Sequence, residues 1–242
     1  MQIANGPIQT AFPQWTAAST LVALHGVGAY NSVMEAVHAT TPTARLDAGI
    51  AAYTSFDHAL DNARQLPLEW AVPNIQKYLS GYDVARQLML QLTNSDLIPG
   101  AREHVGSVTM HSGRGSYATA IRAARMDDSR YGAYLASGWL TAALQDASIG
   151  AALLRTDSTL GTQLVTGIAQ VREAVAKRRA LDPALVNSVG ELFAKADTQL
   201  ALQVDRASRS TTSVTDPAAE RAVMQSTAVL LDGWVATAGV NA

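Results

Sequence analysis

The residues best suited to chemistry are arginines gathered between residues 101 and 130. A guanidinium group offers a fork of donors that binds phosphate or carboxylate through two hydrogen bonds. Five arginines stand in this segment against three acidic residues. Arg122 and Arg125 would share one face of a helix at i, i+3 spacing. The candidates for contact with phosphate or nucleic acid are Arg114, Arg122, Arg125 and Arg130.

The glycines beside Arg114 indicate one way to hold an anion. The run from Gly113 to Ser116 has the composition of a loop and precedes a helix expected to start near Tyr117. Glycines let successive amides converge on an anion, and a helix N-terminus adds positive potential. No Gly-Lys-Ser/Thr follows, so the segment is not a P-loop. A flexible turn is the favoured interpretation, and an anion nest is the functional alternative.

A second basic cluster lies near the end of another expected helix. It contains Arg172, Lys177, Arg178 and Arg179. The dipole of a helix favours positive charge in its last turn, which is sufficient to explain the cluster. Phosphate binding is the weaker alternative for this segment.

The histidines and acids do not form a recognisable metal set. Glu35 and His38 make one E-x-x-H, but a di-iron bundle needs a second such pair and two more glutamates on facing helices. The chain has no cysteine, which excludes disulfides and thiolate chemistry. The sequence therefore predicts no metal site and no cofactor.

Catalytic patterns are equally scarce. The chain contains no G-x-S-x-G and no Ser-x-x-Lys. His104 and His111 remain as acid/base candidates, in a pocket that residues 94–117 would roof. Without a convergent catalytic set, the sequence favours a protein that is not an enzyme, and a helical enzyme with that roofed pocket is an alternative.

The elements that must position these residues are expected to be helices throughout. The chain is rich in Ala, Leu, Gln and Arg, and alternating strand patterns are scarce. Asp182-Pro183 and Asp216-Pro217 each supply an N-cap followed by proline at the first helical position. The expected helices are residues 14–39, 43–65, 68–92, 117–126, 129–155, 158–180, 183–210 and 216–237.

This pattern predicts an all-α bundle of about seven to eight helices with one long irregular loop near residues 94–117. The loop would divide an N-terminal unit, residues 1–93, from a C-terminal bundle, residues 118–242. A single domain is the alternative. The length of 242 residues is compatible with either arrangement.

The two ends of the chain are almost without charge. Met1 to Met34 contain no Asp, Glu, Lys or Arg, and Asp232 is the only charge after Arg221. Ordinary composition would place roughly eight charges in the first stretch. Uncharged segments are usually covered, so we expect self-association through both ends, with residues 1–13 as an arm laid on a neighbour. No apolar run is long enough to span a membrane.

These features together favour a non-enzymatic structural protein that builds a larger assembly, such as a virion coat or part of a secretion or tail apparatus. A coat or nucleoprotein that binds nucleic acid through residues 101–130 is the alternative. The net charge of −2 gives no overall attraction to nucleic acid, so such binding would depend on the local arginines. Composition assigns no cellular compartment.

Overall fold

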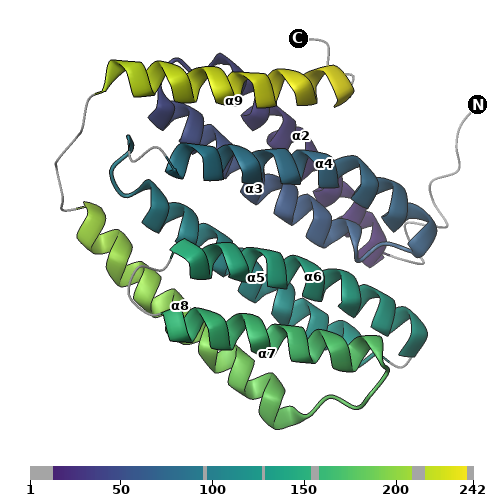
Figure 1. The fold of residues 1–242 in the computed structure, drawn as a ribbon. Helices are drawn as coiled ribbons and strands as arrows, with labels where there is room; N and C mark the ends of the chain where they lie inside the picture. Colours follow the sequence, from purple (N-terminus) through teal and green to yellow (C-terminus); the bar gives the residue numbers. More distant parts are fainter. Residues whose placement is uncertain (1–12, 95–96, 127–128, 154–157, 209–215, 239–242) are drawn as a thin grey trace, which may run out of the picture. The chain divides into compact units, whose positions relative to one another are not determined.

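A computed structural model describes residues 13–94, 97–126, 129–153, 158–208 and 216–238 of the chain (Figure 1). These residues form eight helices and no strand, which confirms the predicted all-α class. The predicted arm, residues 1–13, lies outside the described residues except for Pro13. The helices are α2 (Pro13–His38), α3 (Pro42–Ala63), α4 (Leu68–Thr93), α5 (Ala101–Ala124), α6 (Ser129–Leu153), α7 (Ser158–Ala176), α8 (Pro183–Ser208) and α9 (Pro217–Ala238).

Local signals start three of these helices. The Thr41 hydroxyl accepts a hydrogen bond from the Ala44 amide at 3.2 Å, at the start of α3. The Asp182 carboxylate accepts one from the Ala184 amide at 2.9 Å, and the Asp216 carboxylate caps α9 in the same way. Each cap is followed by proline, whose fixed φ suits the first helical position. The two predicted Asp-Pro caps are therefore confirmed.

The predicted irregular loop over residues 94–117 was wrong. Residues 101–124 form the single helix α5, and the short helix expected from residue 117 is its last part. Gly113 is buried where α5 and α6 meet, and a Cβ there would lie 3.1 Å from the Ala147 nitrogen and 3.2 Å from the Ala143 oxygen. Glycine costs a helix roughly 1 kcal/mol, but close packing of the two helices offsets that cost.

The first compact unit contains α2, α3, α4 and α9. Its centre is an aromatic cluster in which the Tyr30 ring stacks on Trp234 at 5.4 Å and meets Phe56 edge-on at 5.7 Å. Tyr78 completes the cluster from α4. A side chain at Gly26 would collide with the Tyr78 ring, so glycine in α2 is what lets this tyrosine pack inward.

The buried guanidinium of Arg45 ties three helices of this unit together. Its Nε donates to the Ala36 carbonyl at 3.0 Å, and Nη2 donates to the Ala39 carbonyl at 3.1 Å. Its Nη1 donates to the Met224 carbonyl at 2.7 Å and to the Thr227 hydroxyl at 2.8 Å. One side chain of α3 therefore satisfies carbonyls at the end of α2 and in α9.

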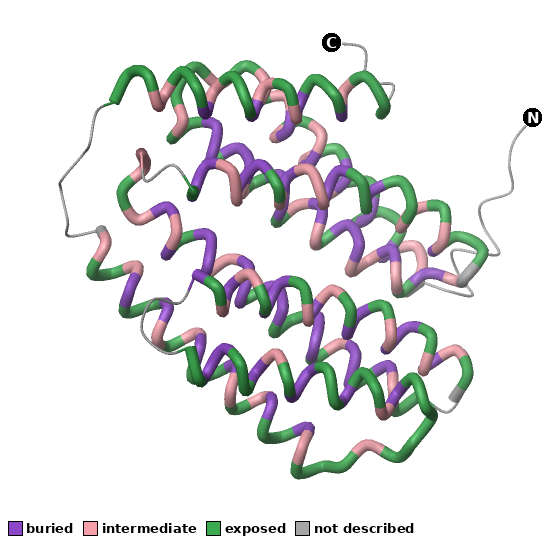
Figure 2. Tube along the Cα trace, viewed as in Figure 1, coloured by how far each residue is buried: buried purple, intermediate pink, exposed green. Residues whose placement is uncertain are grey.

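The second compact unit contains α5, α6, α7 and α8. Trp139, Leu140 and Phe193 are among its largest buried side chains. A polar contact also lies inside it, where the Ser112 hydroxyl stands 3.3 Å from a carboxylate oxygen of the fully buried Asp146. In each unit the buried residues lie along the helix faces that are turned toward neighbouring helices (Figure 2).

The two compact units differ from the predicted division of the chain. One comprises residues 1–98 together with 214–242, and the other comprises residues 99–213. The difference arises because α9 buries Thr227, Leu231 and Trp234 against the N-terminal helices. A local hydrophobic pattern shows that a helix has a buried face, but it does not show which distant helices cover that face.

Candidate functional site

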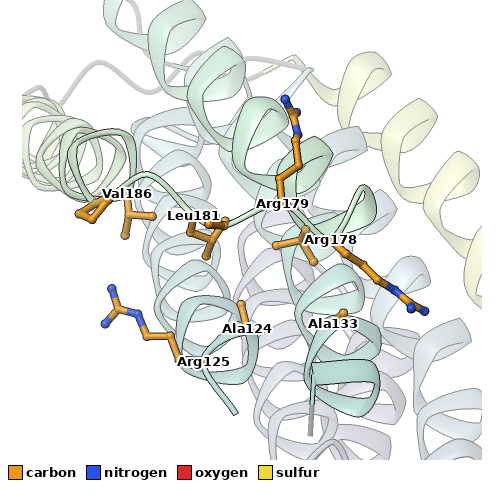
Figure 3. Close-up of a pocket in the computed structure, with 10 residues that line it drawn as sticks. Ala124, Arg125, Ala133, Arg178, Arg179, Leu181 and Val186 are labelled. Carbon is orange, nitrogen blue, oxygen red and sulfur yellow. The ribbon is translucent and has the colours of Figure 1, made fainter. Parts of the chain in front are cut away.

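A pocket of about 410 Å³ lies in the second unit, where α5 and α7 end and α8 begins (Figure 3). Seven of its ten lining residues are alanine, valine, leucine or proline, and the other three are arginines. The lining residues are Ala124, Arg125, Ala133, Val175, Arg178, Arg179, Ala180, Leu181, Pro183 and Val186.

The end of α7 shapes one side of the pocket. The Arg179 amide donates to the Ala174 carbonyl at 2.9 Å, and the Arg178 amide donates to the Val175 carbonyl at 3.0 Å. This pair of hydrogen bonds is the Schellman motif, which usually places glycine at the left-handed position. Here Arg178 occupies that position, with φ 50°. The turn therefore carries two adjacent arginines to the edge of the pocket.

The start of α8 forms the opposite side, and Tyr117 anchors it. The Tyr117 hydroxyl donates to the Val186 carbonyl at 3.1 Å, which holds the first turn of α8 against α5. Burial raises the pKa of Tyr117 well above its ordinary value, and the nearby Arg125 only partly opposes this effect. Tyr117 therefore stays protonated, and remains a hydrogen-bond donor, beyond the pH at which an exposed tyrosine ionises.

Among the described residues, the charged side chains that line the pocket are all arginines, and neither Arg125 nor Arg178 forms an ion pair with a carboxylate. Arg179 lies 3.6 Å from Glu173, but that carboxylate also binds Lys177 at 2.6 Å. Figure 3 shows the three guanidinium groups pointing outward in different directions, away from the alanines and branched side chains that lie between them.

The structure separates the four arginines that the sequence grouped together. Arg125 lines the pocket, whereas Arg114 binds the Asp197 carboxylate at 2.8 Å. Arg122 hydrogen-bonds the Thr119 hydroxyl at 2.9 Å in the preceding turn. Arg130 is exposed at the start of α6 and does not line the pocket.

One further interpretation of the sequence depended on the irregular loop, which does not form. Gly113 to Ser116 lie inside α5, so their amides point along the helix and the predicted nest ahead of a helix does not form. Arg125 instead lines the pocket together with Arg178 and Arg179. The sequence alone explained those two arginines by the dipole of the helix that they follow. Sequence carries no signal for this pairing, because the two segments meet only after α6 and α7 have packed.

The histidines do not lie in the roofed pocket that the sequence suggested. His104 and His111 are exposed along α5, and the loop that would have roofed them is helical. Glu35 and His38 line a shallow hollow with Asp47 at the junction of α2 and α3. Among the described residues, no group of three or more His, Cys, Asp or Glu side chains could hold a metal ion.

A histidine pair that the sequence did not reveal links α2 and α3. The rings of His25 and His58 lie 5.1 Å apart. Burial, followed by repulsion from His58, lowers the pKa of His25. The pair therefore favours the neutral form of His25 in the folded protein.

The outward side of α2 is apolar and uncharged over much of its length. Leu21, Leu24 and Val27 follow one another at three-residue spacing and are 39%, 63% and 61% exposed. No charged residue occurs in α2 before Glu35. We call this surface the α2 face; its exposed members are Ala17, Thr20, Leu21, Leu24, Val27 and Asn31. The exposed side of α9 differs, since Val229 shares it with the charged residues Arg221 and Asp232.

Comparison with known proteins supplies no relative. The chain matches no protein-family model, no curated protein sequence and no solved structure. None of the described helices is long and apolar enough to cross a membrane. Functional inference therefore depends on the surfaces of the described residues, chiefly the α2 face and the histidine pair.

Proposed function

We propose that the protein is a non-enzymatic component of a larger assembly and that it self-associates through the α2 face. The observation that carries this proposal is the exposure of Leu21, Leu24 and Val27 on a helix surface that lacks charge. Single exposed apolar residues are ordinary, but a continuous row on one helix is typical of an interaction surface.

A second copy of the chain is the partner that this surface fits best. In a twofold symmetric contact the same patch meets itself, so a charge near the symmetry axis faces its own copy. The α2 face carries none from Ala17 to Asn31. Those residues extend over about 22 Å of helix at 1.5 Å per residue, which allows two α2 helices to pack side by side.

The energy of such a contact is concentrated in few side chains. Fully burying a leucine or valine contributes about 1.5–3 kcal/mol, and symmetry counts each of them twice. Placing a glutamate at position 24 removes Leu24 from both sides and sets two negative charges close together. We expect the dimer dissociation constant to rise by about a hundredfold or more.

The test measures molar mass by light scattering over a concentration series. The wild-type protein should form a dimer or larger species as concentration rises, and Leu24→Glu should remain monomeric with unchanged circular dichroism. The matched control is Leu202→Glu on α8, since Leu202 is 54% exposed and lies outside the α2 face. This control should associate like the wild type.

Two results would contradict the proposal. A wild-type protein that stays monomeric at the highest soluble concentration would exclude self-association. A Leu24→Glu variant that associates as well as the wild type would move the contact to another surface. If association is found, electron microscopy should then distinguish closed shells or tubes, expected of a coat or a secretion or tail apparatus, from simple dimers.

A further inference from the structure

We propose that His25 and His58 together bind a zinc ion between α2 and α3, with water in the two remaining tetrahedral positions. The two rings come from neighbouring helices of the first compact unit, and their centres lie 5.1 Å apart. Imidazole is a preferred zinc ligand. This site does not depend on self-association through the α2 face.

The separation of the rings matches that of two imidazoles on one tetrahedral ion. Zinc lies about 2.0–2.1 Å from a ligating nitrogen, which is itself about 1.15 Å from the ring centre, so the tetrahedral angle places two ring centres about 5.1–5.3 Å apart. The right angle of an octahedral ion would place them about 4.5–4.6 Å apart. The observed separation of 5.1 Å therefore favours a four-coordinate ion such as zinc.

The nitrogens of both rings are available to a metal ion. Among the described residues, neither imidazole forms a hydrogen bond or an ion pair, and the bond that Asn62 donates to His58 ends on the backbone carbonyl. His58 is exposed and His25 is half-buried, so an ion and its waters reach the pair. Burial, followed by repulsion from His58, lowers the pKa of His25, so this ring is neutral near pH 7, the form that binds metal.

The packing of α2 on α3 holds the two rings in place. One turn nearer the connection between the helices, a Cβ on Gly28 would lie 3.8 Å from the Ser55 hydroxyl oxygen. Farther along the same antiparallel pair, the Arg45 side chain of α3 donates to the Ala36 carbonyl of α2 at 3.0 Å. Ligands that the fold already brings together lose little conformational freedom when they bind the ion.

The protein supplies two ligands to this ion. Asp61 follows His58 by one turn of α3, but its carboxylate lies 3.5 Å from the Arg64 guanidinium. Among the described residues, no group of three or more His, Cys, Asp or Glu side chains could hold a metal ion. Structural zinc sites have four protein ligands, and half of their binding free energy corresponds to a Kd of about 1–200 µM.

Isothermal titration calorimetry of the untagged protein with zinc chloride at neutral pH tests the site. The wild type should bind one ion per chain with a Kd in that range. His25→Gln and His58→Gln should each weaken binding at least tenfold, since even the outer partners of a metal ligand contribute about 10–100-fold to affinity. His111→Gln is the matched control, because His111 is exposed on α5 in the second unit, and it should bind zinc like the wild type.

Thermal unfolding separates metal binding from folding. Zinc at ten times its Kd should raise the melting temperature of the wild type by about 3–6 °C. The rise should disappear in His25→Gln and in His58→Gln, while the circular dichroism of both variants in EDTA stays that of the wild type. A rise that persists in both variants would place the ion elsewhere and contradict the proposal.

Three results of the titration would overturn the proposal. The first is the absence of saturable binding at zinc concentrations up to 1 mM, which is about five times the weakest expected Kd. The second is an equal loss of affinity in His25→Gln and His111→Gln. The third is a loss in His38→Gln as large as that in His25→Gln, because it would place the ion in the hollow that His38 lines with Glu35 and Asp47.

Discussion

Replacing Arg45 by methionine should destabilise the first compact unit and leave the second unchanged. Arg45 is 5% exposed and makes four hydrogen bonds, at 2.7 to 3.1 Å, to acceptors near the end of α2 and in α9. Methionine has a similar length and no charge, so it fills the space without replacing the bonds. The carbonyls of Ala36 and Ala39 would then lose a donor at a helix end, where intrahelical partners are lacking.

The expected loss of stability in Arg45→Met follows from the acceptors that are left without a donor. Hydrogen bonds to a charged group contribute about 1.5–3 kcal/mol each, but the guanidinium also costs free energy to desolvate. Burial accordingly lowers the pKa of Arg45, although arginine stays protonated. Leaving a buried acceptor without its donor costs about 1–3 kcal/mol, so the loss of the guanidinium should cost about 3–5 kcal/mol in total, a large part of the 5–15 kcal/mol that stabilises a domain. Arg45→Lys keeps the charge but loses the fork, and should cost about half as much.

Hydrogen–deuterium exchange with mass spectrometry can locate the change. Peptides from α2, α3 and α9 should exchange about a hundredfold faster or more in Arg45→Met, because each 1.4 kcal/mol corresponds to a factor of ten in opening. Peptides from α5 to α8 should keep wild-type protection, since they belong to the other unit.

Either of two results would contradict the role assigned to Arg45. Arg221 is exposed on α9, so Arg221→Met serves as a control that should change the free energy of unfolding by less than about 0.5 kcal/mol. If Arg45→Met is no more destabilising than this control, the hydrogen bonds contribute nothing. If α9 keeps its protection while α2 and α3 lose theirs, Arg45 does not couple the C-terminal helix to the N-terminal ones.

Two other perturbations test features that packing decides. Gly113→Leu should lower the free energy of unfolding, measured in urea, by about 1–3 kcal/mol, because its Cβ site faces the backbone of α6. Gly115→Leu has open space at its Cβ site, so it should raise the free energy of unfolding by about 0.5–1 kcal/mol. The lowered pKa of His25 means that the unfolded state binds more protons near the ordinary value of 6.5, so stability should fall as the pH drops from 7 toward and through the folded pKa. His25→Gln should flatten that slope, while His58→Gln, which leaves the larger cause in place, should remove only part of it; equal slopes in wild type and His25→Gln would contradict this assignment.

Local chemistry made most of the helices predictable. Pro42, Pro183 and Pro217 each follow a residue whose side chain caps the helix. The cap and the proline both fix the backbone over only a few residues, so a short stretch of sequence is enough to predict where the helix begins. Helix-forming residues between these signals then leave few other conformations. The expected range 68–92 agrees with α4 within one residue for this reason, even though Pro73 lies inside the helix.

The candidate site could be predicted only in part. Arg125 was a candidate from its charge, but its grouping with Arg114, Arg122 and Arg130 relied on nearness in sequence. Arg122 and Arg125 lie three residues apart, yet the contacts of the grouped arginines differ, because Arg122 binds Thr119 and Arg114 binds Asp197 on a distant helix. The partners that share the pocket with Arg125 come from the end of α7, and only the packing of the bundle brings them there.

The class of fold, the ends of most helices and the lack of charge on α2 can be read from the sequence, because each depends on residue type and short-range spacing. Tertiary structure alone decided that Gly113 belongs to a helix, that α9 packs with the N-terminal helices, and that Arg125 meets Arg178 and Arg179. The physical reason is the same in each case. These features depend on contacts between segments far apart in the chain, and the energy of such packing can exceed a local conformational preference.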